Sequence, residues 1–311
     1  MKKILTLVSV FTLAVVALAG CGASLDNGSS NKTTKTAKIA PKKLKVGVSL
    51  STLSNPFFVS VKSGITSVAT KNGTDVEVMD AQDDSAKQSN DIEDLIQKKV
   101  DIIIVNPVDS DAITPEIKNA NDANIPVIAL DRSSTGGQVL TLVASDNVKG
   151  GKMAAEYMAK KLGKNAKVAE LQGTPGASAT RERGEGFDKN VKGKLDVVTK
   201  QSANFDRAKG LSVMENLLQS NPDIKGVFSQ NDEMALGAIE AAKSAGKSDL
   251  VIVGFDGSVD GLKAVKSGKL TATVAQQPEE MGKIAIKAAY DHFDGKKLDK
   301  KISSPLELVT K

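Results

Sequence analysis

Short apolar runs alternate with segments of helical period from Leu44 to the C-terminus. In the longer segments the apolar positions lie three or four residues apart, as in Phe58, Val61, Ile65 and Val68. Repeated β-α-β units of this kind predict parallel sheets covered by helices on both faces, and the number of runs favours two sheets. The runs that predict strands are Leu44–Leu50, Asp75–Met79, Ile102–Val105, Val127–Leu130, Val139–Ala144, Lys167–Leu171, Val197–Gln201, Gly226–Ser229, Val251–Gly254, Thr271–Ala275 and Leu306–Val309.

The alternation breaks at two places, which we interpret as crossings between two lobes. After Arg132 a strand-like run follows with little intervening helix, and a new helix begins near Asp146. After Gln276 the chain enters a helix that ends near His292, and a last strand follows. We therefore expect an N-terminal lobe of residues 44–145 and 277–305 and a C-terminal lobe of residues 146–276 and 306–311.

The beginning of the chain has a different pattern. Lys2 and Lys3 precede an apolar segment, Ile4–Ala19, that is too short and wrongly flanked for a comfortable membrane span. This arrangement predicts a secretory signal peptide over residues 1–20.

Cys21 is the only Cys of the chain. A secreted protein with one Cys cannot form an internal disulfide, so an anchoring role for this thiol is more economical than a structural one. The alternative is an ordinary cleaved signal with an incidental Cys. Residues 21–43 lack an apolar period and are rich in Gly, Ser, Asn, Thr and Lys, which predicts a flexible tether.

The distribution of charge argues against nucleic acid as a partner. The formal net charge is +5, but residues 46–311 hold 34 Lys and Arg against 36 Asp and Glu. The excess of positive charge therefore lies in the leader and the tether, and the folded part has no general attraction to phosphate backbones.

The apolar run Pro126–Leu130 ends abruptly in Asp131 and Arg132. The run is typical of a strand buried on both faces, and its carboxyl end lies at the edge where open α/β sheets bind ligands. Asp131 only accepts hydrogen bonds, whereas Arg132 presents five donors in a rigid fork, so the pair suits a polyhydroxylated molecule. The alternative is an Asp that caps the next turn beside a surface Arg.

Polar groups and Phe residues also follow most of the other predicted strands. Planar polar groups can each contact two hydroxyls, and Phe faces cover the apolar C–H patches of a sugar. Because the ends of parallel strands share one edge of a sheet, we expect these side chains to converge on a single cleft. The alternative for each residue alone is structural, since Asn and Asp also cap helices and Phe fills cores. The residues are Asn55, Phe57, Phe58, Asn106, Gln172, Asn204, Phe205, Asp206, Gln230, Asn231, Asp232, Phe255, Asp256, Gln276 and Gln277.

Six motifs occur in a fixed order along the chain: STLSNPFFV at 51–59, IALDR at 128–132, ASDN at 144–147, RERGEGF at 181–187, QNDEMA at 230–235 and VGFDG at 253–257. From residue 44 to the C-terminus the chain resembles the bacterial ribose-binding proteins of ABC import systems. The resemblance implies two Rossmann-like, doubly wound parallel-sheet lobes of the periplasmic binding protein type I fold. A three-segment hinge would join the lobes, and the cleft between them would close over the pyranose form of D-ribose.

The same resemblance implies roles for ten residues. Phe57, Phe58 and Phe205 would stack on the sugar, and the hydroxyl contacts would come from Asn55, Asp131, Arg132, Arg183, Asn231, Asp256 and Gln276. Spacing alone favours a solvated charged face for the segment around Arg183, and only the resemblance selects Arg183 over Arg181. Asn106 remains a candidate for a supporting role.

The sequence around Cys21 resembles the lipobox of bacterial lipoproteins. That resemblance implies that Cys21 is acylated and that the chain is anchored outside the cytoplasm, at the outer face of the cell membrane. An anchored chain does not diffuse freely, and a chemotaxis receptor is not an expected partner. The expected partners are D-ribose, the permease subunits of an ABC transporter and the membrane through the lipid at Cys21. We expect a monomer that binds no nucleic acid.

Other functional classes find little support in the residues. An enzyme would need a nucleophile with its base, a metal cluster or a phosphate loop, and the chain offers one His, His292, and one Cys. No dinucleotide fingerprint or P-loop appears, so we expect no catalytic residues, metal or cofactor. Binding of another small sugar or a furanose-like ligand remains an alternative. A sugar-sensing repressor would need an N-terminal DNA-binding helix-turn-helix, whereas this chain begins with a signal and a tether.

Overall fold

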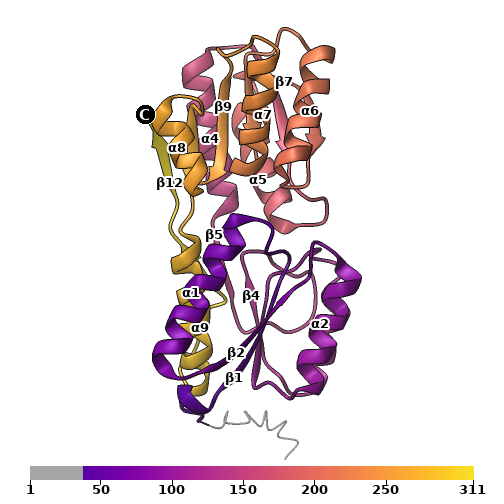
Figure 1. Cartoon of the computed structure of the whole chain (residues 1–311), viewed down its shortest axis with the longest axis vertical. Helices are drawn as coiled ribbons and strands as arrows, with labels where there is room; N and C mark the ends of the chain where they lie inside the picture. The colour runs from indigo at the N-terminus through magenta and orange to yellow at the C-terminus, as the bar shows by residue number, and fades with distance from the viewer. Residues whose placement is uncertain (1–37) are drawn as a thin grey trace, which may run out of the picture. The chain divides into compact units, whose positions relative to one another are not determined.

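Two six-stranded sheets, each with helices on both faces, make up the part of the chain that the computed structural model describes, residues 38–311 (Figure 1). The fold class is the predicted one, α/β with two doubly wound lobes. The predicted signal peptide, Cys21 and most of the predicted tether lie outside the described residues.

The sheet of the N-terminal lobe has the strand order β11-β5-β4-β3-β1-β2, and all of its neighbouring strands are parallel. Parallel strands buried on both faces require continuous apolar runs, which explains the Ile-rich segment of β3. The strands are β1 Lys45–Leu50, β2 Asp75–Asp80, β3 Ile102–Val105, β4 Val127–Leu130, β5 Leu142–Ser145 and β11 Lys301–Ser304.

Helices α1 (Pro56–Asn72) and α9 (Pro278–Phe293) cover one face of this sheet. Helices α2 (Ser85–Gln97) and α3 (Thr114–Asp122) cover the other. Both faces of the sheet are therefore apolar cores, and the polar groups of the lobe gather at the strand ends.

The sheet of the C-terminal lobe has the order β12-β10-β9-β8-β6-β7, and β12 alone runs antiparallel to its neighbour. The strands are β6 Ala166–Gln172, β7 Leu195–Ser202, β8 Gly226–Ser229, β9 Val251–Asp256, β10 Ala272–Ala275 and β12 Glu307–Thr310. One face packs on α4 (Asn147–Leu162) and α5 (Ser178–Val191). The other packs on α6 (Arg207–Ser220), α7 (Asp232–Ser244) and α8 (Val259–Ser267).

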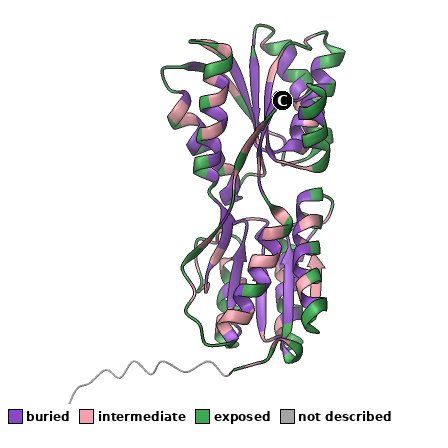
Figure 2. Ribbon diagram, turned by 90° about the vertical axis from the view of Figure 1, so that its left-hand side faces the viewer, coloured by how far each residue is buried: buried purple, intermediate pink, exposed green. Residues whose placement is uncertain are grey.

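The chain passes between the two sheets three times, after β5, after β10 and after β11. Figure 2 shows these connections as narrow segments between two bodies that each have a buried interior. Three short segments join two rigid lobes, which is the arrangement that permits hinge rotation.

Paired glycines let helices of each lobe approach closely. A Cβ at Gly151 of α4 would overlap the backbone of Arg183 in α5, and a Cβ at Gly186 of α5 would overlap the carbonyl oxygen of Val148 in α4. Gly64 and Gly282 play the same part where α1 crosses α9. Glycine at 151 and 186 allows α5, and with it Arg183, to lie close against α4.

The predicted strands are confirmed to within a few residues. The structure differs from the predictions at two places, one strand and the end of the tether. Strand β11 was missed because it contains a single apolar residue, Ile302, and gains its place by pairing with β5. The predicted tether runs to residue 43, whereas the structure has a 3₁₀ turn at Pro41–Lys43 and packs Ile39 against the core. The last residues of that segment therefore belong to the N-terminal lobe.

Candidate functional site

The strand ends of both lobes meet at one small cavity. Gln276 does not line the cavity, but it donates to Asp256 at 2.8 Å. The other nine residues predicted from the sequence line it together with Ala179: Asn55, Phe57, Phe58, Asp131, Arg132, Arg183, Phe205, Asn231 and Asp256.

Asn55 is the N-cap of α1, and its Oδ1 accepts a hydrogen bond from the backbone N–H of Phe57 at 2.9 Å. Pro56 occupies the first helical position, where its missing N–H is not needed. This cap places Phe57 and Phe58 in the first turn, with ring centroids 5.2 Å apart and ring planes at 89°. The two rings give the N-terminal lobe an apolar wall in the cavity.

Asp131 has a left-handed backbone with φ of 62°, and its side chain is only 4% exposed. It accepts no backbone N–H among the described residues, so the capping alternative is wrong. Burial raises the pKa of the Asp131 carboxyl, while the charges of Arg132 and Arg183 oppose that rise. The carboxylate therefore depends on partners inside the cleft.

Arg132 is held by the N-terminal lobe and faces aromatic rings from both lobes. Its Nη1 donates to the carbonyl oxygen of Pro107 at 3.0 Å, and its Cζ lies 5.3 Å from the Phe58 centroid and 5.5 Å from the Phe205 centroid. Its Nε lies 3.8 Å from Asp131 Oδ2, beyond hydrogen-bond length. One end of the guanidinium is therefore fixed by the N-terminal lobe, and the group also faces Phe205 of the C-terminal lobe.

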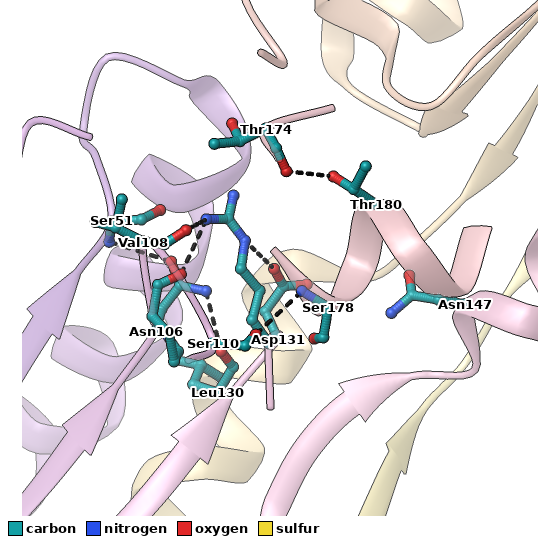
Figure 3. A network of polar contacts seen from close by, with 12 residues as sticks. Ser51, Asn106, Val108, Ser110, Leu130, Asp131, Asn147, Thr174, Ser178 and Thr180 are labelled. Atoms are coloured by element: carbon teal, nitrogen blue, oxygen red, sulfur yellow. Dashed lines mark hydrogen bonds and ion pairs between the residues drawn. The ribbon is translucent and has the colours of Figure 1, made fainter. Parts of the chain in front are cut away.

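Asn106 ties three strand ends together beneath Asp131. Its Oδ1 accepts from the N–H of Ser51 at 3.1 Å, and its Nδ2 donates to the carbonyl oxygen of Leu130 at 3.0 Å (Figure 3). Gln88 of α2 donates to the Asn106 carbonyl oxygen at 2.9 Å. The side chain is fully buried and outside the cavity lining, which is the supporting position suggested from the sequence.

Arg183 is buried, whereas Arg181 is exposed, so the charged-face alternative is wrong for Arg183. Its Nε donates to Asn147 Oδ1 at 2.9 Å and its Nη1 to the carbonyl oxygen of Gln230 at 2.6 Å. The guanidinium carbon lies 3.9 Å from the Phe255 centroid, a cation–π contact. These contacts leave one edge of the guanidinium for the cavity.

Phe205 and Asn231 form a second rigid unit of the C-terminal lobe. Asn231 caps α7 by accepting from the N–H of Met234 at 2.9 Å, and its Nδ2 donates to the carbonyl oxygen of Phe205 at 3.0 Å. Phe205 has a φ of 59°, and its ring occupies the space that a Cβ at Gly173 would fill. A side chain larger than glycine at 173 would displace this ring.

Asp256 combines strain, burial and charge. Its φ is 113°, a region that L-residues rarely adopt, and its Oδ1 lies 3.4 Å from Arg183 Nη1. Burial raises the pKa of Asp256 to about 8, although Arg183 opposes the rise. Asp131, Phe205 and Asp256 all have positive φ, and such backbone strain concentrates at functional sites.

Three buried polar atoms at the site have no hydrogen-bond partner within residues 38–311: Asp131 Oδ1, Arg132 Nε and Gln276 Oε1. Leaving a buried donor or acceptor unpaired costs about 1–3 kcal/mol. Asp131 and Arg132 line the cavity, so a molecule with several hydroxyl groups bound there can satisfy the unpaired acceptor of Asp131 and the unpaired donor of Arg132.

Asp232 is a supporting residue to which the sequence reasoning gave no separate role. Its Oδ2 accepts from the N–H of Ser258 and its Oδ1 from Thr273 Oγ1, both at 2.7 Å. These bonds hold the turn that follows Asp256. Burial raises the pKa of Asp232 to about 6, and the two hydrogen bonds oppose that rise. Its motif could be read from the sequence, but an Asp after a capping Asn gives no signal of burial.

The described residues offer no cluster of three or more His, Cys, Asp or Glu side chains that could hold a metal ion. Among the helices of residues 38–311, none has the length and hydropathy of a membrane crossing.

Comparison with known proteins gives a consistent set of similarities. The family described as periplasmic binding protein domain matches residues 46–297. The ribose import binding protein RbsB of Bacillus subtilis (strain 168) is 55% identical over 310 residues, covering 100% of this chain and 99% of that protein. The RbsB protein of Escherichia coli (strain K12), also named a ribose import binding protein, is 47% identical over 312 residues, with the same two coverages.

A solved structure shares the fold. The ABC transporter periplasmic solute binding protein from Actinobacillus succinogenes 130z, crystallised with bound D-allose, has a TM-score of 0.80 at 32% identity. The match covers 86% of this chain and 98% of that chain.

The raised pKa of Asp232 predicts a pH dependence of stability. Between pH 4 and pH 6 the Asp232 carboxyl binds a proton in the folded state that it releases in the unfolded state, so the contribution of this group to stability falls as pH rises through this window and is then constant. The shift from 3.8 to about 6 corresponds to about 3 kcal/mol. Asp232→Asn should remove this fall when urea unfolding is measured from pH 4 to pH 8. Parallel curves for wild type and variant would contradict the assignment.

Proposed function

Because the chain belongs to the periplasmic binding protein family, we propose that it captures D-ribose between its two lobes and delivers it to the permease of an ABC importer. The single observation that carries this proposal is the small cavity with three unpaired buried polar atoms, enclosed by aromatic rings. A pyranose has the matching chemistry, since its hydroxyls donate and accept while its C–H faces are apolar.

We assign the contacts as follows. The carboxyl groups of Asp131 and Asp256 accept from sugar hydroxyls, and the guanidinium groups of Arg132 and Arg183 donate to sugar oxygens. The amides of Asn55, Asn231 and Gln276 add contacts on both sides, and Phe57, Phe58 and Phe205 pack against the C–H faces. Each hydroxyl held by a charged partner contributes about 1.5–3 kcal/mol, so several together support micromolar binding or tighter, about 8 kcal/mol.

The binding cycle follows from the division of the site between lobes. Asp131 and Arg132 follow β4 of the N-terminal lobe, whereas Arg183 of α5 and Asp256 at the end of β9 belong to the C-terminal lobe. A sugar that contacts both groups binds the closed form more tightly than the open form and shifts the population toward closure. The permease then recognises the closed shape.

Another small sugar is the second candidate ligand, because the solved relative from Actinobacillus succinogenes holds D-allose. The higher identity to proteins named for ribose, 55% and 47% against 32%, favours the pentose. A repressor role finds less support, since both of these relatives are named import binding proteins over the full length of the chain.

We further propose that the chain works outside the cytoplasm as a monomeric lipoprotein. In this arrangement residues 1–20 direct secretion, Cys21 carries the lipid, and the following segment spans the distance to the N-terminal lobe. The motive is the lipobox-like sequence LAGC at 18–21 after an apolar leader. Lysines in the tether add weak attraction to anionic lipid head groups.

Calorimetry with the purified chain and a panel of sugars tests the proposed ligand. D-ribose should bind more tightly than D-allose, glucose and galactose, because three bulky Phe side chains line the cavity and leave little room for a hexose. Absence of heat with ribose, together with tight binding of another sugar, would contradict the assignment to ribose and leave the fold untouched.

Arg132→Ala tests the clamp formed with Asp131. Removal of one charged partner in a closing cleft should weaken ribose binding by about 2–5 kcal/mol, thirtyfold or more. Arg181→Ala is the matched control, because Arg181 is exposed and lies outside the cavity lining. Ribose titration of both variants gives the comparison, and near-normal affinity in Arg132→Ala would remove Arg132 from the site.

Cys21→Ala tests the anchor separately from the pocket. The variant should keep the ribose affinity of the wild type in solution, yet lose acylation and be released from the membrane fraction of cells. Retention in the membrane fraction would show that Cys21 does not hold the anchor.

A further inference from the structure

Three hydrogen bonds join the lobes at a place that does not line the cavity. The N–H of Ser133 donates to Ser178 Oγ at 2.9 Å, the N–H of Ser178 donates to Ser110 Oγ at 3.1 Å, and the N–H of Ser110 donates to the carbonyl oxygen of Gly176 at 3.1 Å. Ser110 and Ser133 belong to the N-terminal lobe, and Gly176 and Ser178 to the C-terminal lobe. Figure 3 shows Ser110 and Ser178 beside Asp131.

Helix α5 lacks a cap of its own. Its N-cap residue is Ala177, which makes no side-chain hydrogen bond, and its first turn contains no acidic residue. The other helices of the C-terminal lobe are each capped by the side chain of their own N-cap residue: Asp146, Asp206, Asn231 and Ser258. The first N–H of α5 bonds instead to Ser110 of the opposite lobe. Helix α5 is therefore capped across the cleft, and it is the helix that carries Arg183.

These bonds depend on closure. When the lobes separate, Ser178 and Ser133 lose their partners and water must replace them, whereas bonds within one lobe persist. Any interaction made only in the closed form raises the closed population, and the apparent affinity for a cleft ligand rises with that population.

We propose that Ser110, Ser133 and Ser178 form a latch that sets the affinity of the cleft for its ligand without contacting the ligand. The proposal rests on the proposed function only in taking ribose as the cleft ligand. The latch also couples closure to the cap of α5, so that Arg183 is held most firmly when the lobes are together.

Gly176 makes the latch possible. It has a φ of 87°, and a Cβ at this position would overlap the carboxylate of Asp109 in the opposite lobe. Asp109 cannot easily move aside, because its Oδ1 accepts from the N–H groups of Asp111 and Ala112 at 2.8 and 2.9 Å. A side chain at 176 therefore meets Asp109 when the lobes are together, in addition to the backbone strain that it carries in either form.

The first test removes single latch groups. Ser178→Ala and Ser110→Ala should each raise the Kd for ribose about three- to tenfold, the range expected for one neutral hydrogen bond. The Kd of a second, weaker-binding sugar should rise by the same factor, since the latch does not touch the sugar. Thr74→Val is the control, because it removes a hydrogen bond to Tyr290 within one lobe and should lower thermal stability with no change in Kd.

The second test obstructs the latch. Gly176→Ala should raise the Kd more than tenfold, while Gly193→Ala should leave it unchanged. Gly193 has a comparable φ of 73° with open space around it, so it carries the same backbone strain without the contact between lobes. Equal Kd values for these two variants would contradict the latch.

Small-angle scattering of the sugar-free chain tests the effect of the latch on closure without any ligand. Ser178→Ala and Gly176→Ala should give a larger mean radius of gyration than wild type, Thr74→Val or Gly193→Ala. Equal radii and equal Kd values would overturn the latch. Failure of the wild type to bind ribose, with the differences in radius retained, would overturn only the proposed function.

Discussion

The burial of two opposite charges at the end of β4 is the constraint on which the site depends. Asp131 and Arg132 are 4% and 3% exposed, and moving such ions out of water costs several kcal/mol each. Their own contact, 3.8 Å between Nε and Oδ2, is too long to repay that cost. The closed cleft is therefore stable only if other groups in it stabilise these two charges. The aromatic faces and backbone carbonyls around Arg132 supply part of that stabilisation. In our proposal a polyhydroxylated ligand supplies the rest.

The remainder of the fold serves to hold these groups rigidly. The parallel sheets bring strand ends to one edge, glycine contacts fix α5 against α4, and Asn106 links the strand ends under Asp131. Strain at Asp131, Phe205 and Asp256 is sustained by the surrounding packing. Asp232 is an example of a residue that supports the site from outside, since it accepts a hydrogen bond from the turn after Asp256 and does not line the cavity. Such a site needs little rearrangement once the lobes are together, which keeps the entropic cost of binding low.

The features that depend on neighbouring residues could be predicted from the sequence, whereas contacts between distant segments could not. The spacing of Phe58, Val61, Ile65 and Val68 predicted a helix, and the structure has α1 there, with Asn55, Phe57 and Phe58 in the lining of the cavity. Arg183 could be separated from Arg181 only by resemblance, because helical spacing does not say which of two arginines faces a partner two elements away. The bond between Ser110 and Ser178 joins residues 68 positions apart in different lobes, and two serines carry no signal of it. Strand β11 was missed for a similar reason, since its place comes from β5.

The central claim is that a ribose molecule satisfies the buried polar atoms that the protein leaves unpaired. A crystal structure of the chain grown with D-ribose tests this most directly. We expect sugar oxygen atoms within hydrogen-bond distance of Asp131 Oδ1 and Arg132 Nε, about 2.7–3.2 Å, and a Phe ring against a C–H face. A sugar bound elsewhere, or a closed cleft in which ordered water alone meets those atoms while ribose is present in excess, would contradict the account.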